Sequence, residues 1–123
     1  MKKILITEDE KNLSQIYKAK LEDVGYSVDI VNTGLSAVDY VKTTKPDLVI
    51  LDIKLPDVNG IKVLQEIKQE YSDLPVIMCT AYGQFEGYYQ RFAGEETRFC
   101  GYLTKPVSLE ALVSEVKKAI GDP

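Results

Sequence analysis

The chain has 123 residues, of which 45% are hydrophobic and 28% are charged. This composition is typical of one globular domain with a single core, and it excludes disordered and fibrous proteins. The net charge of −4 provides no basic surface for nucleic acid or for an anionic membrane. No apolar run is as long as a membrane span, and the run that follows Met1 is too short for a secretory signal, so we expect a cytoplasmic protein.

Short apolar runs alternate with amphipathic segments along the chain, a pattern typical of α/β proteins. The runs predict strands over 3–7, 26–31, 48–51, 75–80 and 101–104. Helices are predicted between them, with boundaries at residues that favour helix ends: Gly25, Pro46, Gly60 and Ser108. Apolar residues at helical spacing predict the buried faces of these helices: Leu13, Ile16, Tyr17, Leu21 and Val24; Leu35, Val38 and Val41; Ile61, Leu64, Ile67 and Tyr71; and Leu109, Leu112, Val113, Val116 and Ile120.

The stretch between the last two strands is less regular. Aromatic residues at helical spacing favour a short fourth helix there, which belongs either to the core or to a partner surface: Phe85, Tyr88, Tyr89 and Phe92. Gly87 weakens this helix by about 1 kcal/mol relative to alanine. We expect residues 84–99 to be the least ordered part of the fold.

Strand–helix units joined by short connections imply a parallel sheet with right-handed crossovers and helices on both faces. The predicted architecture is a flavodoxin-like, doubly wound (βα)5 fold with the strand order 2-1-3-4-5. Residues 1–123 then form one domain without a linker or a repeat.

Polar residues stand where the predicted strands end. Glu8 and Asp9 follow the first strand, Asp52 follows the third, Thr80 ends the fourth and Lys105 follows the fifth. In a parallel sheet these ends lie along one edge, so we expect the five side chains to form one pocket.

The chemistry available to such a pocket is restricted. Clustered carboxylates repel one another unless a cation lies among them. Oxygen ligands without histidine favour Mg²⁺ or Mn²⁺, and Cys79 and Cys100 lack a metal-like spacing and are expected to be buried. A metal beside Asp52 can neutralise an incoming phosphoryl group, the carboxylate can attack phosphorus, and Lys105 and Thr80 can bind the phosphoryl oxygens.

These residues, in this order, resemble the receiver domain of two-component response regulators, like the single-domain regulators of chemotaxis and of the sporulation phosphorelay. The resemblance spans the whole chain and includes Leu55-Pro56-Asp57, Asn59-Gly60 and Thr80-Ala81. It implies that Asp52 accepts a phosphoryl group from a phosphohistidine on a sensor histidine kinase or a histidine phosphotransfer protein.

The resemblance also implies how the metal and the phosphoryl group are held. Asp9, Asp52 and the backbone carbonyl of Lys54 would bind Mg²⁺ directly, and Glu8 would act mostly through metal-bound water. Lys105 would pair with the phosphoryl oxygens, and the bond between Lys105 and Pro106 is cis in the family.

Two further pairs of residues receive roles from the resemblance. Thr80 would move toward the aspartyl phosphate and Tyr102 would rotate inward behind it, although Tyr102 can equally be a core aromatic. This switch would change the face of the fourth helix, last strand and last helix, which a downstream protein or a missing output domain would bind. Lys54 and Tyr82 would flank the path of the water that hydrolyses the aspartyl phosphate. If they obstruct this water, the phosphate should be lost slowly.

Two rival functions stay open at this point. An aspartate-nucleophile phosphohydrolase would carry a second acid two residues after its nucleophile, where this chain has Lys54. A phosphorylation-independent interaction module would not need the complete set of acids, threonine and lysine. We therefore expect a signalling domain, not an enzyme, whose only chemistry is its own phosphorylation and dephosphorylation.

Overall fold

The computed structural model describes residues 1–81 and 101–123, except for the side chain of Thr80, and the structural statements below concern this part of the chain. Its elements, in chain order, are β1 (Lys3–Thr7), α1 (Lys11–Val24), β2 (Ser27–Val31), α2 (Gly34–Thr44), β3 (Leu48–Leu51), α3 (Gly60–Glu70), β4 (Val76–Thr80), β5 (Gly101–Thr104) and α5 (Leu109–Ile120). The alternation of strands and helices is confirmed. The predicted fourth helix and the expected low order of residues 84–99 fall outside the described residues.

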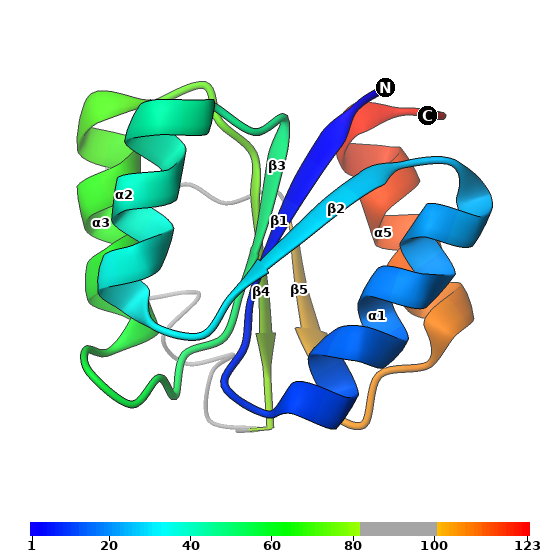
Figure 1. Cartoon of the computed structure of the whole chain (residues 1–123), viewed down its shortest axis with the longest axis horizontal. Coiled ribbons are helices and arrows are strands. Elements are labelled where there is room, and N and C mark those ends of the chain that lie inside the picture. Colours follow the sequence, from blue (N-terminus) through cyan, green and yellow to red (C-terminus); the bar gives the residue numbers. More distant parts are fainter. Residues whose placement is uncertain (82–100) are drawn as a thin grey trace.

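The strands form a parallel five-stranded sheet in the order β2-β1-β3-β4-β5, which confirms the predicted flavodoxin-like topology. Helices α1 and α5 cover one face of the sheet, and α2 and α3 cover the other (Figure 1). Because all the strands run the same way, their carboxyl ends share one edge, the lower edge in Figure 1. None of the described helices is long and apolar enough to cross a bilayer.

The core has two layers, because successive residues of a strand point to opposite faces of the sheet. In β3, Val49 and Leu51 pack in the layer beneath α2 and α3, whereas Leu48 and Ile50 pack in the layer beneath α1 and α5. We call these the α2/α3 layer and the α1/α5 layer. Both faces of β3 are buried, which explains why its apolar run is continuous instead of alternating.

Two residues that the sequence predicts to face the core are exposed instead. Ile16 of α1 is 51% exposed and Leu35 of α2 is 61% exposed. The buried positions of α2 are Gly34, Ala37 and Val41. A Cβ on Gly34 would lie 2.4 Å from Val58 Cγ2, so a larger residue would not fit there. Of the three residues of this helix predicted to face the core, Val41 is buried and Val38 packs against the core, so the prediction is wrong for Leu35 alone.

The helix ends follow capping chemistry. The Ser108 hydroxyl accepts a hydrogen bond from the Ala111 N–H at 3.0 Å, which confirms the predicted cap of α5. Gly25 ends α1 with a φ of 124°, as the sequence predicts. Lys45, whose backbone adopts the left-handed helical conformation, ends α2 immediately before Pro46.

Asp57 joins the loop after β3 to the start of α2. Its two carboxylate oxygens accept hydrogen bonds from the N–H groups of Gly34 and Leu35, at 2.8 and 2.9 Å. The Thr33 hydroxyl accepts one from the Ser36 N–H at 3.1 Å. The first amides of α2, which have no partner within the helix, are thus bonded by side chains. The bonds from Leu35 and Gly34 lower the pKa of Asp57.

Replacing Asp57 by alanine should lower the melting temperature by a few degrees, because the amides of Gly34 and Leu35 lose their acceptors. Asp57→Asn keeps one acceptor oxygen and should lose less. Because the folded pKa of Asp57 is lowered, its contribution is present at neutral pH and is lost as the pH falls through that value. Thermal unfolding followed by circular dichroism measures both effects. If Asp57→Ala and the wild-type protein had equal melting temperatures at neutral pH, the prediction would be contradicted.

Candidate functional site

Three carboxylates and one ammonium group meet at the carboxyl edge of the sheet. Glu8 and Asp9 follow β1, Asp52 follows β3 and Lys105 follows β5. One carboxylate oxygen from each of the three acids lies within 4.8 Å of the other two. The acids and the lysine that the sequence assigns to one pocket are therefore neighbours in the fold.

Lys105 lies between two of these acids. Its Nζ donates to Asp52 Oδ2 at 3.0 Å and also forms an ion pair with Glu8 Oε1. Glu8 is 2% exposed and Asp52 is 6% exposed, whereas Asp9 faces solvent. A buried carboxylate is costly without a partner, and one lysine serves as the partner of both.

The pocket still holds more negative than positive charge. Burial raises the pKa of Glu8, the Asp52 carboxylate raises it further and Lys105 opposes the rise, with a result of about 7 against the ordinary 4.5. Burial lowers the pKa of Lys105, but hydrogen bonds with Glu8 and Asp52 outweigh burial and raise it overall. Lys105 is therefore charged at neutral pH while Glu8 is only partly ionised, and an added cation would favour its ionised form.

Backbone contacts hold Asp52 in place. Its N–H donates to Thr7 O at 3.2 Å, and the Lys54 N–H approaches Asp52 Oδ1 at 3.3 Å. Gly60, the first residue of α3, donates its N–H to Ile53 O at 2.7 Å. A Cβ on Gly60 would lie only 2.0 Å from Asp52 O, so glycine is what allows α3 to begin this close to the acid.

Three further residues predicted for the site are not among the clustered acids and lysine. Thr80 pairs with Thr104 at the end of β4, but its side chain and the whole of Tyr82 are outside the described residues. Tyr102 is partly buried and packs against the α2/α3 layer, so it contributes to the core, and its switching role stays a prediction. The Lys105–Pro106 peptide bond is cis, as the resemblance implies.

A buried polar group beneath Glu8 was not predicted. Tyr17 of α1 and Cys79 of β4 are buried as expected, at 2% and 3% exposure. The Tyr17 hydroxyl and Glu8 Oε2 are also buried, and neither has a hydrogen-bond partner among the described residues. Helical spacing identifies Tyr17 as a core residue, but it does not indicate where the hydroxyl lies.

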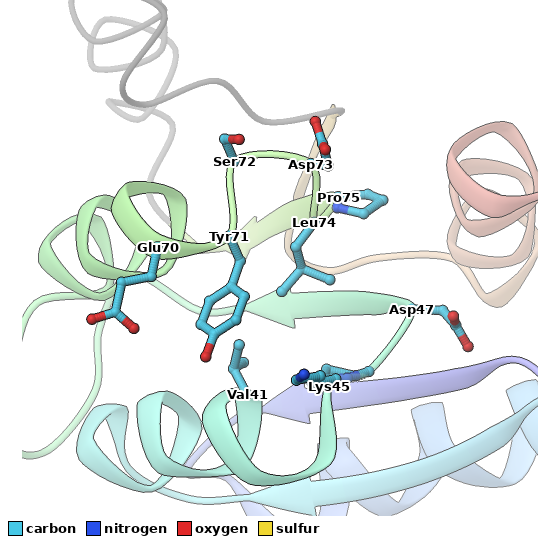
Figure 2. Close-up of a pocket in the computed structure, with 10 residues that line it drawn as sticks. Val41, Lys45, Asp47, Glu70, Tyr71, Ser72, Asp73, Leu74 and Pro75 are labelled. Atoms are coloured by element: carbon cyan, nitrogen blue, oxygen red, sulfur yellow. The ribbon is translucent and has the colours of Figure 1, made fainter.

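A separate hollow of about 480 Å³ lies at the opposite edge of the sheet, where α2 and α3 end (Figure 2). Figure 2 shows the Tyr71 ring directed toward Val41, with Leu74 beside it and Lys45 and Asp47 at the rim. No residue predicted for the acidic pocket lines this hollow, so the two features are distinct.

Comparison with known proteins identifies the family. The family model of the response regulator receiver domain matches residues 4–117. The chain belongs to this family, the signalling receiver domains of two-component response regulators.

Two relatives have about twice the length of this chain. The transcriptional regulatory protein DltR of Streptococcus agalactiae serotype III is 34% identical over 115 residues, which cover 94% of this chain and 50% of DltR. The response regulator ArlR of Staphylococcus epidermidis is 33% identical over 120 residues, which cover 98% of this chain and 53% of ArlR. The chain thus spans about half the length of these relatives.

Solved structures show the same fold. A CheY-like receiver domain protein from Methanospirillum hungatei has a TM-score of 0.89 and 28% identity, over 98% of this chain and 94% of the other. The response regulator TrrA from Thermotoga maritima, in complex with Mg²⁺–BeF, has a TM-score of 0.84 and 32% identity, over 97% of this chain and 99% of TrrA.

The stability of the metal-free protein should fall as the pH rises from about 5 to about 8. The unfolded chain releases the Glu8 proton near pH 4.5 and the folded protein releases it near 7, so the free energy of unfolding declines between these values. The full decline is up to roughly 3 kcal/mol. The chain has no histidine, the side chain whose ordinary pKa lies within this interval.

Urea unfolding in EDTA at several pH values measures this slope. Glu8→Gln cannot ionise and should remove it, and saturating Mg²⁺ should flatten it because a cation favours the carboxylate form. A slope that persists unchanged in Glu8→Gln would show that another group is responsible.

Proposed function

We propose that Asp52 accepts a phosphoryl group from a phosphohistidine of a sensor histidine kinase or a histidine phosphotransfer protein. The observation that carries this proposal is the position of Asp52, in contact with Lys105 and within 4.8 Å of two further acids at the carboxyl edge of the sheet. An Asp oxygen forms a bond to phosphorus while the phosphorus–nitrogen bond breaks, and its electron pair leaves with the histidine of the donor.

The donor set of the pocket fits Mg²⁺ or Mn²⁺. Glu8, Asp9 and Asp52 offer only oxygen atoms, and the backbone carbonyl of Lys54 is the further ligand that the resemblance implies. When bound, the metal neutralises charge on the phosphoryl oxygens. The buried, unpartnered Glu8 Oε2 and the raised pKa of Glu8 both indicate a site that is short of positive charge. The Mg²⁺–BeF complex of the relative TrrA supports the same ion here.

Other residues of the pocket orient the phosphoryl group. Lys105 already contacts Asp52, so its ammonium is placed to pair with the phosphoryl oxygens once they are attached to that carboxylate. Thr80, at the end of the adjacent strand β4, would supply a hydroxyl donor. Lys105, Thr80 and Asp52 are the residues to which we assign the phosphoryl chemistry.

The output of this domain is proposed to lie on the face that includes β5 and α5. Thr80 and Tyr102 would couple the phosphoryl group to that face, where a downstream protein or an output domain would bind. The double length of DltR and ArlR supports an output domain beyond the receiver domain that we assign to residues 1–123. We expect no direct contact of this acidic domain with nucleic acid or a membrane, and a cytoplasmic location stays a prediction.

Neither rival function gains support. A phosphohydrolase would need an acid where Lys54 stands, two residues after Asp52. An interaction module that works without phosphorylation leaves the ion pairs of Lys105 with two buried acids unexplained.

Incubation with acetyl phosphate and Mg²⁺ should add one phosphoryl group, measured by intact mass spectrometry. Asp52→Asn and the addition of EDTA should each abolish it, because they remove the nucleophile and the metal. Asp57→Asn is the matched control, since Asp57 lies in the same loop but outside the acidic cluster, and it should still be phosphorylated. Phosphorylation that survives in Asp52→Asn, or catalytic turnover of phosphate esters, would contradict the proposal.

The phosphorylated protein should lose its phosphate slowly, and Lys54→Asn together with Tyr82→Glu should speed the loss. Lys54 lies two residues after Asp52 and Tyr82 two residues after Thr80, and we propose that the long chain and the ring obstruct the attacking water. The decay of phosphorylated protein after removal of acetyl phosphate measures the rate. An unchanged decay in the double variant would show that these side chains do not obstruct water.

A further inference from the structure

A buried polar group lies beneath the acidic pocket, between β1, β4 and α1. It consists of the Glu8 carboxylate, the Tyr17 hydroxyl and the Cys79 thiol, from residues that are 2%, 2% and 3% exposed. Glu8 uses Oε1 for its contact with Lys105, and its other oxygen, Oε2, is buried without a partner among the described residues. The Tyr17 hydroxyl is likewise buried without a well-formed hydrogen bond among the described residues, and the weakly polar Cys79 thiol interacts with it.

These three side chains lie on the same face of the sheet. Along β1, Ile4 and Ile6 belong to the α1/α5 layer, and alternation places Glu8 on that face as well. Tyr17 and Cys79 are members of the same layer. Thr7, by contrast, precedes Glu8 by one residue and points to the α2/α3 layer, so its buried hydroxyl is on the other side of the sheet.

The charges of the pocket act on the Tyr17 hydroxyl. Burial raises the pKa of Tyr17, the adjacent Cys79 thiol raises it further, and Glu8 and Asp52 add to the rise. The hydroxyl therefore keeps its proton and is a donor, and the buried Glu8 oxygen is an acceptor. A buried hydroxyl donor with only a weakly polar thiol beside it and a buried carboxylate oxygen without a partner are costly unless something joins them.

We propose that Tyr17 is a positioning residue for Glu8. Its hydroxyl donates toward Glu8 Oε2 through one buried water, for which the Tyr17 hydroxyl, the Glu8 carboxylate and the Cys79 thiol provide the polar partners. This contact holds the inner oxygen of Glu8 in the α1/α5 layer and keeps Oε1 directed at Lys105 and the acidic pocket. The inference rests on the proposed function, because it assigns Glu8 to the metal site.

The expected consequence is a weaker metal site when the hydroxyl is removed. Groups that orient metal-binding side chains without touching the metal typically change the affinity by 10–100-fold, and Glu8 is expected to act mostly through water, so we expect about a tenfold loss. Tyr17→Phe deletes the hydroxyl alone and keeps the ring that fills the core. Thr7→Val is the matched control. It too deletes one buried hydroxyl, but this hydroxyl belongs to β1 and lies on the opposite face of the sheet, in the α2/α3 layer.

Isothermal titration of the metal-free protein with MgCl2 tests the inference, together with the ¹³C NMR signal of the Glu8 side-chain carboxyl. Tyr17→Phe should weaken Mg²⁺ binding about tenfold and shift the Glu8 signal before Mg²⁺ is added, whereas Thr7→Val should leave both unchanged. In a Glu8→Gln background, Tyr17→Phe should have no further effect on binding. Unaltered binding and an unaltered Glu8 signal in Tyr17→Phe, or equal losses in Tyr17→Phe and Thr7→Val, would overturn it.

The same experiments separate this inference from the proposed function. If the wild-type protein binds no Mg²⁺, or if Asp52→Asn binds it unchanged, the proposed metal site fails. The Glu8 carboxyl signal of the metal-free protein still reports whether Tyr17 orients Glu8, because that measurement needs neither metal nor phosphoryl transfer.

Discussion

The balance of charge at the carboxyl edge of the sheet is the constraint on which the site depends. Glu8 and Asp52 are almost fully buried and directly follow the adjacent strands β1 and β3. Lys105 reaches both acids from the far side of β4. One ammonium among three carboxylates makes the burial tolerable without neutralising it, and the remaining charge favours a divalent cation.

The backbone around Asp52 is constrained as tightly as its side chain. Gly60 allows α3 to begin against the carbonyl of Asp52, and Asp57 binds the first amides of α2. The loop that follows Asp52 is thus attached to both helices that cover one face of the sheet. A change of charge at Asp52 acts on a loop with little freedom of its own, which is a suitable arrangement for passing a change at the carboxylate to neighbouring elements.

The sequence predicted the strands, their order and the acidic pocket, because these depend on local patterns. Apolar runs identify strands, and residues such as Asp52 and Lys105 that follow such runs must meet at one edge of a parallel sheet. The exposure of Ile16 and Leu35 was not predictable in the same way. It depends on how each helix is rotated against the core, and α2 approaches Val58 and Val63 through Gly34, which leaves the next residue, Leu35, in solvent.

The sequence by itself determined the fold class, the family and the three acids and the lysine that meet at one edge of the sheet. Alternation of apolar runs and the identity of strand-end residues are properties of short segments. Only the tertiary structure decided that Lys105 contacts both Glu8 and Asp52, that Asp57 binds α2, and that the Tyr17 hydroxyl lies in the layer beneath Glu8. These contacts join residues distant in the chain, and they follow from strand order, helix rotation and side-chain direction, which no local pattern contains. Asp52 was therefore predictable as an acid at a strand end, but its surroundings were decided by the packing of the whole domain.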